Sequence, residues 1–118
     1  MDIVLKSIEK YWIFLTLVIF TAITVLSLSP LETLPPVPGT DKTHHFVAYA
    51  TLMLPTALKK PNHWVLLIPL FIVCSGAIEL IQPYVNRYGE WKDLWANIGG
   101  LVCGLIIAEI VKRFFVAR

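Results

Sequence analysis

The chain has 118 residues, of which 57% are hydrophobic and 15% charged, and its formal net charge is +2. Soluble domains carry about 25% charged residues, so this chain has too little polar surface to cover itself in water. The small net charge, with no basic run and no zinc-type cysteine spacing, excludes the usual modes of nucleic-acid binding. The composition predicts one membrane domain over residues 1–118, with the lipid bilayer as its surroundings.

The first predicted span covers about residues 11–29, a run of 19 residues without a charge. At ~1.5 Å per residue this run can cross a hydrocarbon core of ~30 Å. Lys6 and Lys10 precede it, as basic residues also precede a signal peptide. Pro30 stands where a small-residue cleavage site would be expected, so we expect a retained span.

A second, shorter helix is predicted over about residues 44–58. Four prolines within residues 30–39 predict an extended loop before it, because proline lacks a backbone donor and disfavours helix in the preceding residue. Thr40 or Asp41 can cap the helix. Its first turns are polar, and Lys59, Lys60 and Pro61 end it.

Two further spans are predicted over about residues 63–82 and 93–111, so the fold class is an all-α polytopic membrane protein with four transmembrane helices in a compact bundle. Small residues recur every four positions in the last span, at Ala96, Gly100, Gly104 and Ala108. Such a stripe lets another helix approach closely. Packing within the chain is the favoured interpretation, and a homodimer through the Gly100/Gly104 face is the alternative.

Basic residues near the span ends predict the orientation. Seven lie at the amino terminus, the 59–60 loop and the carboxyl terminus: Lys6, Lys10, Lys59, Lys60, Lys112, Arg113 and Arg118. Three lie on the opposite side: Lys42, Arg87 and Lys92. We therefore expect both termini in the cytoplasm.

Alternating spans bring the start of the second helix, the end of the third and the start of the fourth to one membrane face, which the charge count makes extracytoplasmic. Spacings of three and four also place the polar residues of each helix on a shared side. A carboxylate inside the membrane, as predicted for Glu79, is costly and by default marks a functional site. The predicted binding residues are Asp41, Lys42, His45, Tyr49, Glu79, Gln82, Arg87, Asp93 and Asn97.

Residues 41–46 read Asp-Lys-Thr-His-His-Phe, and with Tyr49 they resemble the D-K-x-x-H-F-x-x-Y signature of the VanZ-like family. A later run from Glu79 to Gly100 resembles the second signature of that family. The register makes His45, not His44, the family histidine. The resemblance covers nearly the whole chain and implies a multi-pass protein of the bacterial cytoplasmic (inner) membrane. The family is named after a member linked to low-level resistance to teicoplanin, and the resemblance implies no established reaction.

Several functions remain open for the predicted site. Lys42 and Arg87 could contact the phosphate or carboxylate of an envelope lipid head group or of an amphiphilic glycopeptide, and so affect antibiotic susceptibility. Alternatively, a membrane enzyme could act on a lipid-linked phosphate, with His45 as acid and base and with Glu79 and Asp93 as further catalytic candidates. The polar residues could also serve only to hold the helices together. The pattern specifies no metal site and no cofactor, although the same Asp/Glu/His set could hold a divalent cation through oxygen ligands. Transport is disfavoured because the sequence has no inverted repeat.

Overall fold

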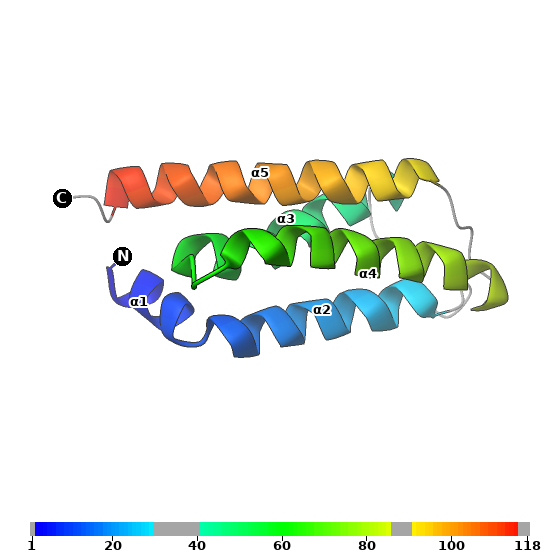
Figure 1. The fold of residues 1–118 in the computed structure, drawn as a ribbon, viewed down its shortest axis with the longest axis horizontal. Coiled ribbons are helices and arrows are strands. Elements are labelled where there is room, and N and C mark those ends of the chain that lie inside the picture. The colour runs from blue at the N-terminus through cyan, green and yellow to red at the C-terminus, as the bar shows by residue number, and fades with distance from the viewer. Residues whose placement is uncertain (1, 30–40, 86–90, 116–118) are drawn as a thin grey trace.

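The computed structural model describes residues 2–29, 41–85 and 91–115. Every regular element among these residues is helical, as predicted (Figure 1). The elements are α1 (Asp2–Lys10), α2 (Trp12–Leu28), α3 (Asp41–Lys59), the 3₁₀ turn η2 (Trp64–Leu66), α4 (Leu67–Ile81), the 3₁₀ turn η3 (Gln82–Val85) and α5 (Trp91–Phe115).

Helix α1 lies outside the four predicted helices. It meets α2 at an angle of 74°. Leu5 is buried against the bundle, whereas Lys6 and Lys10 are exposed. This amphipathic pattern suits a helix that lies across the end of the bundle rather than one that continues the span of α2.

Within the described ranges, two segments are long and apolar enough to cross a membrane, namely Trp64–Tyr84 and Lys92–Phe114. The bent pair of α1 and α2 would make a third span. Large apolar side chains such as Leu70, Val73 and Ile110 are exposed on these helices, as expected of surfaces that face lipid. The predicted four spans are not confirmed, because α3 carries charged residues at both ends and does not qualify by composition.

Helix α3 forms the centre of the hydrophobic core. Tyr49, Leu52, Met53 and Ala57 on this helix are at most 1% exposed. Its polar ends are therefore compatible with a position inside the protein, because its middle faces other helices instead of lipid.

The small-residue stripe of α5 packs against α3 within the same chain. A Cβ atom placed on Gly100 would overlap the backbone carbonyl of Phe46, and one on Gly104 would overlap that of Ala50. Glycine is required at both positions by this close approach of two backbones. The close α3–α5 contact sets how the polar residues of the two helices face each other.

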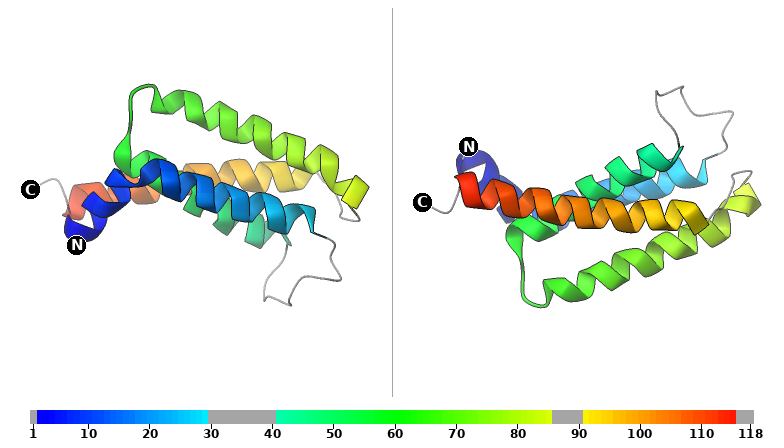
Figure 2. Two further views of the ribbon diagram at one scale, coloured as in Figure 1. Left: turned by 90° about the horizontal axis from the view of Figure 1, so that it is seen from below. Right: turned by 90° about the horizontal axis from the view of Figure 1, so that it is seen from above.

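The start of α3, the end of α4 and the start of α5 lie at one end of the bundle, and α1 and the end of α5 lie at the other (Figure 1). Both views in Figure 2 show the start of α4 running apart from the other helices and its end approaching them. The buried residues of α4 are Phe71 near its start, and Ser75, Ile78 and Glu79 toward the end where the sequence predicts the site.

Candidate functional site

The predicted site residues that the structure describes converge at this end of the bundle. Lys42 is 45% exposed, whereas the other six are at most 7% exposed: His45, Tyr49, Glu79, Gln82, Asp93 and Asn97. We call these six residues, with Lys42 at their edge, the polar cluster. Asp41 is the first residue of α3, but its side chain lies outside the described part, as does Arg87.

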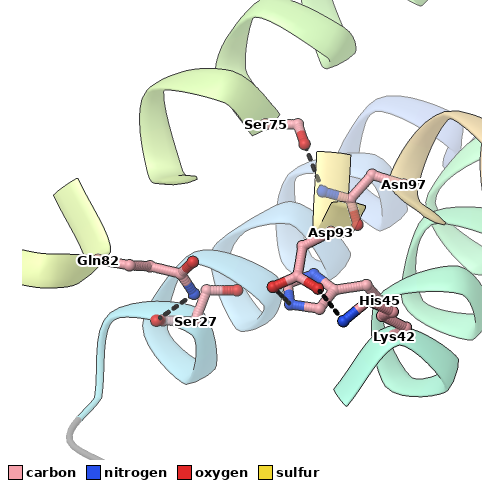
Figure 3. Close-up of polar contacts among 7 residues, drawn as sticks. All are labelled: Ser27, Lys42, His45, Ser75, Gln82, Asp93 and Asn97. Atoms are coloured by element: carbon pink, nitrogen blue, oxygen red, sulfur yellow. Dashed lines mark hydrogen bonds and ion pairs between the residues drawn. The ribbon is translucent and has the colours of Figure 1, made fainter. Parts of the chain in front are cut away.

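Asp93 is the centre of the charged contacts. Its Oδ2 lies 3.8 Å from Nε2 of His45, and its Oδ1 lies 3.7 Å from Nζ of Lys42 (Figure 3). Lys42 and His45 are three residues apart and therefore share one face of α3. Asp93 is in the first turn of α5, where the helix dipole favours a carboxylate. One buried carboxylate thus joins two basic side chains of the neighbouring helix.

Asn97 links α5 to α4, because its Nδ2 donates a hydrogen bond to Oγ of Ser75 (Figure 3). Tyr49 of α3 is also within side-chain hydrogen-bond range of Ser75 and within electrostatic range of Glu79. Ser75 therefore lies where α3, α4 and α5 meet. Ser75 is not among the predicted binding residues, although its position four residues before Glu79 places both on one face of α4.

Gln82 ties the end of α4 to α2. Its Nε2 donates a hydrogen bond of 3.0 Å to the backbone carbonyl of Ser27 (Figure 3). Ser27 lies in the last turn of α2, where carbonyls have no partner within the helix. Sequence spacing could not reveal this partner, because the accepting group is backbone and belongs to a different helix.

Glu79 completes a compact group of possible ligands. His45, Glu79 and Asp93 each offer one nitrogen or oxygen atom, and these three atoms all lie within 4.8 Å of one another. The three residues come from α3, α4 and α5, and all are buried. The sequence prediction that these helix ends meet is thus matched by the geometry of their side chains.

Comparison with known proteins gives one clear result. A protein-family model described as VanZ/LLP1 matches residues 3–112. The chain belongs to this family. The search of curated proteins and the search of solved structures gave no match. The resemblance drawn from the two sequence signatures is confirmed, and the matched region includes the whole polar cluster of this VanZ/LLP1 protein.

The chemistry open to the VanZ/LLP1 chain follows from its side chains. Two buried carboxylates and an imidazole can accept or donate protons or hold a cation. Lys42 supplies an ammonium group that reaches the surface. His44, next to His45, is exposed and lies outside the cluster.

Proposed function

We propose that this VanZ/LLP1 protein acts in the bacterial cytoplasmic membrane, where its polar cluster binds the phosphate-bearing head group of an envelope lipid and thereby alters susceptibility to glycopeptide antibiotics. The observation that supports this most is the position of Lys42. Its ammonium lies 3.7 Å from buried Asp93, yet 45% of the side chain is exposed. Lys42 therefore joins the interior of the cluster to the surface.

The surface near Lys42 is suited to the head-group region of a bilayer. Phe46, one turn after Lys42, is 39% exposed, and Tyr84 and Trp95 at the same end are 88% and 70% exposed. Aromatic side chains of this kind gather at membrane–water interfaces, where lipid phosphates also lie. A lysine can extend along such an apolar surface and hold its charge at the interface.

The proposed orientation has four membrane crossings, both termini in the cytoplasm and the polar cluster at the extracytoplasmic end. It is supported by the distribution of basic residues. A single cysteine introduced by Lys92→Cys, with Cys74 and Cys103 replaced by alanine, should react with a membrane-impermeant maleimide in intact cells. If this cysteine reacted with the maleimide only after the cells were opened, the orientation would be the reverse of the one proposed.

Lipid binding can be tested with two lysine variants at the same end of the bundle. Lys42 and Lys92 are both exposed, but Lys42 contacts Asp93. In native mass spectrometry of the purified protein, Lys42→Met should lower the affinity for phosphatidic acid about tenfold, equivalent to ~1.4 kcal/mol, relative to Lys92→Met. Phosphatidylcholine should bind weakly to every form.

The same variants should differ in cells. At equal expression, the parent and Lys92→Met should shift the inhibitory concentration of teicoplanin, and Lys42→Met should not. Equal phosphatidic acid binding by the two lysine variants would contradict the proposal.

A catalytic function is the second candidate, because His45 lies 3.8 Å from Asp93. A carboxylate beside a histidine can orient the imidazole for proton transfer, and a lipid-linked phosphate would be the substrate. Release of phosphate from such lipids by the parent and by His45→Gln provides the test. Equal rates would remove His45 from any reaction.

A further inference from the structure

The strongest unexplained feature of the polar cluster is the meeting of His45, Glu79 and Asp93. We infer that these three side chains form a binding site for a divalent metal ion, which in turn receives the phosphate of the head group. The metal site is argued from geometry and charge alone, whereas its link to a phosphate rests on the proposed function.

The three ligand atoms are placed by three helices that the rest of the fold holds together. They lie within 4.8 Å of one another, and two ligands of one zinc ion are separated by roughly 3.4 Å. Glu79 has three side-chain torsions through which its carboxylate can approach the other two groups. The side chains are at most 7% exposed, so an ion here would be shielded from bulk water.

Two buried amide oxygens at this end of the bundle have no hydrogen-bond donor among the described residues. Oε1 of Gln82 and Oδ1 of Asn97 are buried and accept no hydrogen bond from the described residues. The amide nitrogens of both residues are already engaged with Ser27 and Ser75. Figure 3 shows the Asn97 oxygen turned away from Ser75 toward the side where Asp93 and His45 lie.

These oxygens need donors or a cation, and a hydrated metal ion supplies both. An amide oxygen is an ordinary ligand of hard cations, and water bound to such an ion donates its protons outward. The oxygen of Asn97 therefore offers a further partner for an ion held by His45, Glu79 and Asp93.

The charge of the cluster also supports a metal site. Among the described side chains of the cluster, Glu79 and Asp93 carry two negative charges when ionised, and Lys42 supplies one positive charge from a half-exposed position. Buried carboxylates are expensive unless they are paired or coordinate a metal. A dication bound between these carboxylates favours their charged forms, and it also allows an anionic phosphate to approach two carboxylates that would otherwise repel it.

The ligand set selects the type of ion. Imidazole nitrogen favours zinc and similar first-row ions, whereas carboxylates also accept manganese, magnesium and calcium. One nitrogen with carboxylate oxygens should therefore bind Zn²⁺ and Mn²⁺ more tightly than Mg²⁺ or Ca²⁺.

Calorimetric titration of the EDTA-treated full-length protein in detergent with Zn²⁺ or Mn²⁺ tests the site directly. The parent should bind one ion per chain. His45→Gln, Glu79→Gln and Asp93→Asn should each weaken binding at least tenfold, whereas Glu109→Gln at the other end of the bundle should leave it unchanged. Circular dichroism would verify that each variant keeps its helices.

Either of two results would overturn the metal site: a parent that shows no saturable binding, or folded variants of all three ligands that bind as the parent does. A Mn²⁺ titration followed by electron paramagnetic resonance gives a second measurement that does not depend on heats of dilution. In that titration the free-ion signal should decrease with the parent and with Glu109→Gln only.

Lys42→Met separates the metal site from the proposed lipid function. Loss of the ammonium beside Asp93 should strengthen Zn²⁺ binding several-fold, because the lysine no longer competes for the carboxylate, while phosphatidic acid binding falls. Weaker Zn²⁺ binding in Lys42→Met would contradict this competition. If the parent binds phosphatidic acid equally well with EDTA and with Zn²⁺, the link between metal and phosphate fails even where the ion itself binds.

Discussion

The charged side chains are exposed at one end of the bundle and buried at the other. At the end that holds α1 and the end of α5, Lys60 forms an ion pair with Glu109, and the two side chains are 35% and 49% exposed. The ammonium of Lys60 also lies 5.4 Å from the centre of the Trp64 ring. At the end that holds the polar cluster, Asp93 is 2% and His45 is 7% exposed.

This difference in exposure changes what the charged contacts cost and contribute. Exposed ion pairs contribute roughly 0–1 kcal/mol and involve little desolvation. Buried carboxylates cost several kcal/mol of desolvation that their partners must offset. A protein that needed only to hold its helices together could use exposed ion pairs at both ends, so the buried charges support the proposed binding site over a purely structural role.

The largest expected effect concerns the close α3–α5 contact that positions the polar cluster. Gly100→Val should lower the free energy of unfolding by about 3 kcal/mol, because the new side chain would overlap the Phe46 backbone. Unfolding in detergent mixtures, followed by tryptophan fluorescence, would measure the loss.

Gly76→Ala is the matched control for this change. A Cβ atom on Gly76 meets nothing within 4 Å, so alanine should be neutral or should stabilise α4 by up to about 1 kcal/mol. Similar losses at Gly76 and Gly100 would show that the α3–α5 contact does not determine the geometry of the site end.

A smaller effect is expected from Asn97→Leu, which removes the hydrogen bond to Ser75. Buried polar contacts between membrane helices contribute about 1 kcal/mol, with the largest near 2. We therefore expect Asn97→Leu to lower the free energy of unfolding by about 1–2 kcal/mol. A double-mutant cycle with Ser75→Ala should return a coupling energy of about 1 kcal/mol. Additive effects would mean that α4 is held by other contacts.

The meeting of the site residues was predictable because it depends on topology. Helices that alternate in direction place His45, Glu79 and Asp93 at one end, and three- and four-residue spacings place their helix neighbours on the same face. Partners that depend on packing were not predictable. Ser75 resembles any small residue of a helix interface, and the Ser27 carbonyl leaves no trace in a side-chain pattern.

Helix α1 and the burial of α3 also could not be predicted from hydropathy. Lys6, Glu9 and Lys10 interrupt the apolar run, so the sequence marks the residues of α1 only as a flank of the first span. The polar ends of α3 indicate a short span by hydropathy alone. Its burial among the other helices depends on glycine contacts with α5, which hydropathy cannot register.

The smallest expected effects come from one substitution made at both ends of the bundle. Glu79→Gln removes a charge that is 4% exposed and keeps the shape of the side chain. In EDTA, where no metal can bind, it should raise the free energy of unfolding by about 1 kcal/mol, because an amide costs less to bury than a carboxylate and its oxygen still accepts the hydrogen bonds of the position. Glu109→Gln, at an exposed ion pair, should lower it by less than about 1 kcal/mol.

The signs of these two changes in the free energy of unfolding matter more than their sizes for the comparison of the two ends. A carboxylate kept at a position where its neutral counterpart is more stable is maintained for what it binds, as is common where activity trades against stability. If Glu79→Gln destabilised the EDTA-treated protein more than Glu109→Gln does, Glu79 would be a structural partner of the neighbouring helices. The two ends would then differ in burial alone, and the case for a functional site would rest on metal and lipid binding.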